Sequence, residues 1–311
     1  MNPAPLHAWI VFGTVITAAL ALDLLAFHRK PRAVSLRRAL IESACWIALA
    51  LAFDAWMYFS IGPRAGLDFL TAYVVEKSLS LDNIFVFLII FQTFRVPPQS
   101  QYKVLFGGVI GALLLRAIFV VAGIELLNLF HALTYIFGGL LVLIGLQMLF
   151  SHERVARPER NWLVRATQKI FPVANRFEGN KFWVRVGNRR SATPLLLALV
   201  AIEAMDIVFA VDSVPAVLAI TRDTFIAYSS NAFAILGLRA LYFAVADVFP
   251  RFRFLHQGVA AILIFVGLKM AVSERFTVST PVSLIVIAGI VALAIAASFA
   301  AGPKNRRGAR S

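Results

Sequence analysis

The chain alternates long apolar stretches with short polar segments. Each apolar stretch has about 20 residues or more, which is the length that an α-helix needs to cross the hydrocarbon core of a bilayer. This pattern predicts an all-α membrane protein in which residues 1–311 form a single transmembrane domain. Its nine predicted spans are residues 7–27, 39–60, 66–94, 104–126, 128–150, 194–220, 223–248, 254–273 and 280–301.

The composition agrees with this pattern. Hydrophobic residues make up 60% of the chain and charged residues 15%, whereas soluble domains have roughly 25% charged residues. Cys45 is the one cysteine, so no disulfide can form within the chain, and no Cys/His cluster predicts a zinc or iron–sulfur site. We therefore expect no prosthetic group.

The net charge of +14 would suggest a nucleic-acid partner in a soluble protein. The basic residues are instead sorted between alternate loops: 23 lie on one side of the nine segments, three on the other and four within segments. Cytoplasmic loops of membrane proteins carry the excess of Lys and Arg. The sequence thus predicts an outside N-terminus, a cytoplasmic C-terminus, the lipid bilayer as surroundings and no nucleic-acid partner.

One long basic loop, residues 151–192, falls on the predicted cytoplasmic side. It contains the amphipathic fragment "NWLVRATQKIF" (161–171). A helix lying on the membrane surface and a flexible basic loop are both compatible with this segment.

Two parts of the chain resemble each other. "VEKSLSLDNIFV" (75–86) aligns with "MDIVFAVDSVPA" (205–216), and "GALLLRAIF" (111–119) resembles "ILGLRALYF" (235–243). Glu76 then corresponds to Asp206, Asp82 to Asp212 and Arg116 to Arg239. The repeats, residues 66–150 and 194–273, each hold three spans and begin on opposite sides of the membrane. Such inverted repeats are typical of secondary transporters, whose substrate sites lie near the bilayer midplane.

Five carboxylates lie well inside the third and sixth spans, although intramembrane acids are costly and usually functional. They offer hard oxygen donors, to which Asn83, Ser213 and Asn231 could add neutral oxygens. A hard divalent cation such as Mn²⁺, Mg²⁺ or Ca²⁺ fits these donors. Alternatively, the acids pair with intramembrane cations and only hold helices together. The acids are Glu76, Asp82, Glu203, Asp206 and Asp212; the counter-charges or gates are Lys77, Arg116, Arg239 and Lys269.

Asp206 and Asp212 are six residues apart, which places them about 120° apart on an ideal helix. They could converge if the helix unwinds between them, or if the cavity is wide. Pro215 disturbs the backbone near residue 211, so we expect a local break there. Asp23 and Asp54, in the first two spans, could line a proton path or merely add polarity near a helix end.

No Ser–His–Asp set, P-loop or zincin motif is present, so we expect neither an enzyme nor an ATPase, and an ion gradient would drive transport. The chain resembles the TerC family of integral membrane proteins, including its Alx branch. The resemblance runs over almost the whole chain, from "ALDLLAFHRK" (21–30) through "VVEKSLSLDNIFVF" (74–87) and "DIVFAVDSVPAVLAIT" (206–221) to "SNAFAILGLRALYF" (230–243).

The resemblance implies export of Mn²⁺ across the bacterial inner membrane, with exchange for protons as the expected drive. It also implies metal contacts at Glu76, Asp82, Asp206 and Asp212, with Glu203 nearby. Two alternatives remain: a transporter for Ca²⁺ or for divalent cations broadly, and a non-transporting membrane scaffold in envelope stress or redox handling.

Overall fold

The computed structural model describes residues 5–27, 36–130, 132–150, 162–170, 172–174, 177–186, 189–245, 254–273 and 278–301. Within these ranges the chain is almost entirely helical. The elements are α1 (Leu6–Phe27), α2 (Leu36–Ser60), α3 (Pro63–Thr93), α4 (Pro98–Leu129), α5 (Ala132–Phe150), α6 (Trp162–Ile170), β1 (Trp183–Val186), β2 (Arg189–Ala192), α7 (Pro194–Leu218), α8 (Thr224–Leu236), α9 (Leu238–Val245), α10 (Leu255–Ala271) and α11 (Thr280–Ala300).

Six helices in the described part of the chain are long and apolar enough to cross a membrane: α1, α2, α4, α5, α7 and α11. Helix α10 is apolar but shorter, and α3 is long but carries five charged residues. The predicted fold class, an all-α membrane protein, is confirmed. The count of nine crossings stays a prediction. Eight predicted segments each match one helix, while residues 223–248 contain both α8 and α9.

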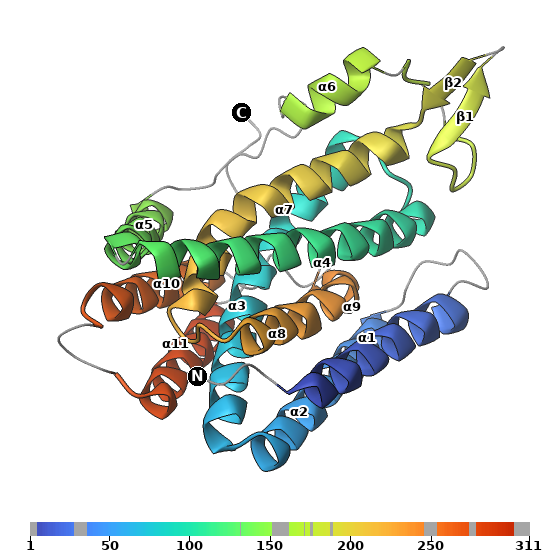
Figure 1. The fold of residues 1–311 in the computed structure, drawn as a ribbon. Coiled ribbons are helices and arrows are strands. Elements are labelled where there is room, and N and C mark those ends of the chain that lie inside the picture. Colours follow the sequence, from blue (N-terminus) through green and yellow to red (C-terminus); the bar gives the residue numbers. More distant parts are fainter. Residues whose placement is uncertain are drawn as a thin grey trace.

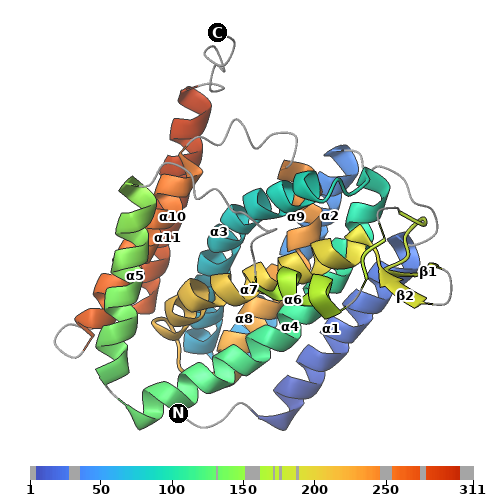
Figure 2. The same ribbon diagram turned by 90° about the horizontal axis from the view of Figure 1, so that it is seen from above.

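The helices are arranged around α3, α7 and α8. Figure 1 and Figure 2 show α5, α10 and α11 together on one flank of this centre and α1 and α2 on the opposite flank. Helix α5 packs along α10, α4 along α7, and α3 along α8, with further packing of α3 on α7 and of α4 on α8. Exchanging α3, α4 and α5 for α7, α8 and α10 maps this set of contacts onto itself, as inverted repeats would require.

Glycines allow α5 and α10 to approach closely. A Cβ atom at Gly138 would lie 2.8 Å from the carbonyl oxygen of Gly267, and a Cβ atom at Gly267 would lie 2.7 Å from the carbonyl oxygen of Gly138. Gly145 likewise faces the backbone of Ala260. Small residues at helix contacts in membranes permit this backbone packing, which supplies much of the association energy there.

Replacing Gly267 by valine is expected to destabilise the protein by about 1–3 kcal/mol, because the added side chain meets backbone that cannot move aside cheaply. The loss should be read as a lower unfolding temperature in detergent. Gly139→Val is the matched control, since a Cβ atom at Gly139 would meet nothing within 4 Å. Equal stability of the two variants would contradict the close α5–α10 contact.

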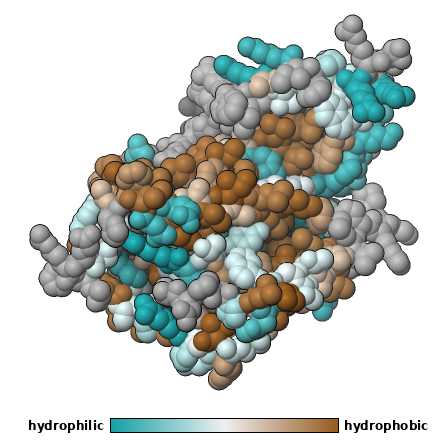
Figure 3. Space-filling model, viewed as in Figure 1, coloured by the Kyte–Doolittle hydropathy of each residue, from teal (hydrophilic) through white to brown (hydrophobic). Residues whose placement is uncertain are grey.

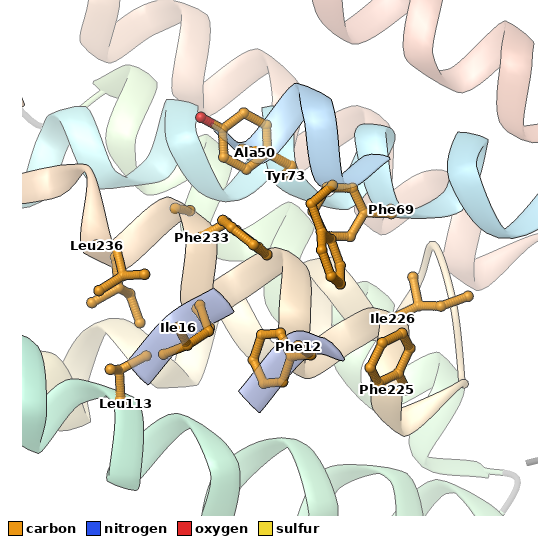
Figure 4. Packing of buried hydrophobic residues seen from close by; sticks show 14 of the residues in the cluster. Phe12, Ile16, Ala50, Phe69, Tyr73, Leu113, Phe225, Ile226, Phe233 and Leu236 are labelled. Carbon is orange, nitrogen blue, oxygen red and sulfur yellow. The ribbon is translucent and has the colours of Figure 1, made fainter. Parts of the chain in front are cut away.

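An aromatic cluster joins the first two helices to the rest of the bundle. Phe53 of α2 stacks obliquely on Phe233 of α8, with ring centroids 4.7 Å apart. Phe12 of α1 contacts Phe225 edge to face at 5.9 Å. Figure 4 shows Phe12, Phe225, Phe233 and Phe69 of α3 gathered in one layer. Helices α1 and α2 are therefore anchored on the ends of α3 and α8.

The basic segment 151–192 contains more regular structure than its sequence predicted. Its amphipathic fragment forms α6, so residues 162–170 are helical, whereas residues 151–161 lie outside the described part. That this helix lies on the membrane surface stays a prediction. Strands β1 and β2 form an antiparallel hairpin, which the sequence pattern did not predict. Asn180 ties it to α4, because its carbonyl accepts from Lys103 at 2.6 Å and its Oδ1 from Ser100 at 2.7 Å. Figure 3 shows hydrophilic residues gathered at this end.

The expected break in the sixth span is wrong. Helix α7 runs without interruption from Pro194 to Leu218 and includes Pro215. Proline removes one backbone donor there, but the surrounding helices hold the chain helical. The interruption instead separates α8 from α9 at Gly237, in the next predicted span. A Cβ atom at Gly237 would lie 2.5 Å from the Lys77 ammonium, so a side chain there would displace the end of Lys77.

Candidate functional site

Four polar side chains meet inside the bundle from four different helices. Glu76 belongs to α3, Arg116 to α4, Asp206 to α7 and Asn231 to α8, and all four are buried. These are the helices that form the central packing contacts. The same contacts that join the two predicted repeats thus carry these residues to one place.

Arg116 links two of these helices to its own. Its Nη1 atom lies 2.7 Å from Oε1 of Glu76 and donates a hydrogen bond to Oδ1 of Asn231 at 2.6 Å. Neither carboxylate oxygen of Glu76 accepts a well-aligned hydrogen bond from the described residues. The Arg116–Glu76 contact is therefore an ion pair with poor N–H alignment, and both carboxylate oxygens keep acceptor capacity.

Asp206 is the second acid of this group. It interacts with the charges of both Arg116 and Glu76. Within the described residues its carboxylate forms no ion pair and accepts no hydrogen bond that the structure records. It lines a small cavity, with about 10 Å³ of space for the centre of a water molecule, together with Gly108 and Arg239. Such a cavity has room for about one water molecule.

The structure brings together only part of the predicted metal set. Glu76 and Asp206 are close enough to interact, whereas Asp212 lies farther along α7 and is half-buried. Asp82 falls within α3, but its side chain lies outside the described part of the structure. No group of three or more His, Cys, Asp or Glu side chains suited to a metal is found among the described residues. The four-carboxylate site stays a prediction.

Other predicted ligands have different surroundings. The half-buried carboxyl group of Glu203 packs against Gly111 of α4, where an added Cβ atom would overlap it. The hydroxyl of Ser213 donates to the Phe209 carbonyl at 2.7 Å, and Asn83 is buried on α3. Oδ1 of Asp54 is buried without a hydrogen-bond partner among the described residues.

The predicted counter-charges have separate partners. Lys77 donates to the Ala234 carbonyl at 3.4 Å, near the end of α8. Lys269 interacts electrostatically with Asp68, whose carboxylate accepts from Thr280 at 2.7 Å. Sequence reasoning missed Asp68. Its position one helical turn after the basic Arg64, at the start of the third span, was the available signal.

A second buried charge cluster joins α1 to α9. Arg239 forms a two-pronged ion pair with Asp23, using both Nη atoms and both carboxylate oxygens. The guanidinium also stacks over the ring of Tyr102 of α4, with its Cζ atom 4.3 Å from the ring centroid. Glu42 of α2 interacts electrostatically with Asp23 and Arg239. The sequence had placed Asp23 on a proton path or near a helix end without identifying this partner.

Two cavities that are larger than the one beside Asp206 lie away from the central acids. One, of about 590 Å³, is lined by Arg64 and Lys269 at the ends of α3 and α10. Another, of about 260 Å³, includes Asp68 and Arg222. Both cavities are large and lie near helix ends, which indicates open clefts. We therefore place the candidate site at the buried charges of Glu76, Arg116 and Asp206, and not at either of these cavities.

Comparison with known protein families gives a match over the helices that carry the central charges. A family model described as the integral membrane protein TerC family matches residues 61–307. The chain belongs to the TerC family. The matched part runs from α3 through α11 and includes Glu76, Arg116, Asp206 and Arg239, whereas Asp23 and Asp54 precede it.

Several curated TerC relatives cover nearly the whole chain. A membrane protein of Myxococcus xanthus, STKORF319, is 45% identical, covering 94% of this chain and 91% of its own. A Rickettsia bellii membrane protein is 38% identical, covering 94% and 96%. Alx of Escherichia coli K12, named as a candidate membrane-bound redox modulator, is 40% identical, covering 92% of each chain. No solved structure matches. This TerC protein is a multi-pass membrane protein.

Proposed function

We propose that this TerC protein is a secondary transporter that exports Mn²⁺ across the bacterial inner membrane in exchange for protons. The observation that carries the proposal is the buried meeting of Glu76, Asp206 and Arg116 at the contact between the two predicted repeats. Charges inside a membrane protein are costly and usually mark an ion or substrate pathway.

The chemistry of the group suits a hard divalent cation. When both are ionised, Glu76 and Asp206 carry two negative charges against the single positive charge of Arg116. The oxygens of Glu76 accept no aligned hydrogen bond from described residues, so they could turn to a cation without breaking one. Carboxylate and amide oxygens suit Mn²⁺, with Asn231 as a neutral donor. Asp82 and Asp212 would add further charge in the predicted four-carboxylate site.

Proton exchange follows from the same carboxylates. An ionised carboxylate binds metal and a protonated one releases it, so metal and proton compete for one site. The ion gradient can then drive export without ATP hydrolysis. The transported Mn²⁺ is the substrate in this proposal, and no resident metal or prosthetic group is required.

We propose nine membrane crossings, in which α8 and α9 together make the seventh. The N-terminus would be outside and the C-terminus cytoplasmic. Nine alternating crossings place the starts of α3, α5, α8 and α11 on the outer side, and hydrogen bonds between these ends support this arrangement. Arg222 before α8 donates to Thr134 at the start of α5, and Thr280 at the start of α11 donates to Asp68 near the start of α3. At the other end, Tyr242 of α9 donates to Gln101 at the start of α4.

Reporter fusions should place the two ends of the chain on opposite sides. A fusion before residue 6 should be active only in a periplasmic reporter, and one after residue 301 only in a cytoplasmic reporter. The sorting of basic residues between loops is the physical reason. Activity of both fusions on the same side would contradict nine crossings.

The purified protein in sealed proteoliposomes tests the transport proposal directly. An imposed proton gradient should drive Mn²⁺ across the membrane, and dissipating the gradient should stop it. Competition by excess Ca²⁺ or Mg²⁺ in the same vesicles separates a Mn²⁺ transporter from a broad divalent-cation transporter. No gradient-dependent flux of any divalent cation would reject the proposal.

A membrane scaffold is the second candidate function, favoured by the ordered surface formed by α6 and the β1–β2 hairpin. Its basic side chains Arg185 and Arg190 are exposed, and the Alx relative is named as a candidate redox modulator. A scaffold should depend on this surface and not on Asp206. Transport should show the reverse dependence.

A further inference from the structure

The two arginines that the repeats place in equivalent positions have different partners. Arg116 in the first repeat pairs with Glu76 and with Asn231 of the opposite repeat. Arg239 in the second repeat pairs with Asp23 of α1, a helix that lies outside both repeats. The symmetry between the two repeats is broken at this contact.

Applying the repeat correspondence to the Arg116 site predicts a second site around Arg239. Glu76 corresponds to Asp206. Asn231 precedes Arg239 by eight residues, and Gly108 precedes Arg116 by the same number. Arg239, Asp206 and Gly108 line one small cavity. The residues equivalent to the Arg116 pair are thus already assembled, but the ion pair between them is absent.

The surroundings of Arg239 are compatible with a second ion pair, between Arg239 and Asp206. Its Nε atom is buried and has no hydrogen-bond partner among the described residues. Asp206 has no recorded ion pair in the same part of the structure, and it interacts electrostatically with Arg116, Glu76 and Glu203. Gly108 offers no amide where the equivalent Asn231 has one, and Ile202 packs there instead, 3.1 Å from the position of an added Cβ atom.

We propose that Arg239 is a switch residue that exchanges Asp23 of α1 for Asp206 of α7. The structure shows the state in which Arg239 is held by α1. In the other state Arg239 pairs with Asp206, as Arg116 pairs with Glu76, and α1 is released. Inverted-repeat transporters change access by moving one structural unit against the other around a fixed site.

The exchange connects α1 to the proposed cation site. Arg239 on Asp206 would neutralise a carboxylate that the metal needs, whereas Arg239 on Asp23 leaves Asp206 available. Metal binding therefore favours the state held by α1, and metal release favours the exchange. This inference deepens the proposed transport function and rests on it for its biological meaning.

Unfolding temperatures in detergent without metal test the exchange. If Arg239 has two alternative partners, Asp23→Asn and Asp206→Asn should each lower the unfolding temperature modestly. The double variant should lose more than the sum of the two shifts, because the buried arginine then loses both alternative carboxylates and keeps only its electrostatic interaction with Glu42. When Arg239→Gln is added to the two single variants and to the double variant, the shifts in unfolding temperature caused by Asp23→Asn and Asp206→Asn should become additive.

Glu125→Gln in place of Asp206→Asn is the control, since Glu125 lies on the exposed surface of α4. Its combination with Asp23→Asn should be additive. Additive shifts for Asp23→Asn and Asp206→Asn, or non-additivity that persists with Arg239→Gln, would overturn the exchange.

Failure of Asp23→Asn to fold is also informative. If Asp23→Asn with Arg239→Gln folds while Asp23→Asn alone does not, Arg239 has no second partner and the exchange is rejected. Because these measurements contain no metal and no vesicles, they stand apart from the transport assay. A positive result with no Mn²⁺ flux would reject the transport proposal and leave the exchange intact.

Discussion

Replacing Asp206 by asparagine should abolish proton-driven Mn²⁺ export and raise the Mn²⁺ content of cells grown in excess manganese. Asparagine keeps the size and one oxygen but removes the negative charge, and carboxylate count sets the affinity of sites for hard cations. We expect at least about a tenfold loss of apparent Mn²⁺ affinity, by analogy with losses seen when metal sites lose even an indirect partner. Flux into proteoliposomes measures the loss.

The stability of Asp206→Asn shows whether Asp206 acts as a metal ligand or as half of a structural ion pair. Asp206 has no recorded ion pair in the described structure, so Asp206→Asn should unfold only slightly below the unmodified protein. Glu125→Gln, on the exposed surface of α4, is the control that should change neither flux nor stability. Normal Mn²⁺ flux in folded Asp206→Asn would exclude this residue from the site.

Replacing Arg116 by glutamine should be the most destabilising single change in the central site. It leaves Glu76 buried without its ion-pair partner and removes the hydrogen bond to Asn231. Breaking one side of a buried pair costs about 3–5 kcal/mol, because the remaining charge is left uncompensated. The unfolding temperature in detergent and the yield of folded protein should both fall.

The matching double variant distinguishes pairing from a general loss of packing. Arg116→Gln combined with Glu76→Gln removes both charges and should recover most of the stability lost by Arg116→Gln alone. It should not recover Mn²⁺ flux, since Glu76 is a proposed ligand. If the double variant is as unstable as the single one, Arg116 stabilises the fold by contacts other than its pair with Glu76.

The sequence predicted the spans because hydrophobic length is a local property. A helix must present about 20 apolar residues to the bilayer wherever it packs, so eight of the nine predicted segments each match one helix, while their number as membrane crossings stays a prediction. The break in the seventh segment was missed because the apolar pattern continues through it; Lys77 of α3, far away in the sequence, donates to the Ala234 carbonyl there. The hairpin was missed because its short strands are held partly by Asn180 and α4.

For the candidate site, too, the sequence determined one part and the tertiary structure another. The sequence by itself determined which side chains are exceptional, since an acid or arginine within an apolar span stands out without any knowledge of its neighbours. It also predicts which of them correspond between the two proposed repeats. Only the tertiary structure decided the partners: Arg116 pairs with Glu76, whereas Arg239 pairs with Asp23. Partners on different helices depend on how those helices pack, and this depends on contacts between residues far apart in the sequence, such as Gly111 against Glu203.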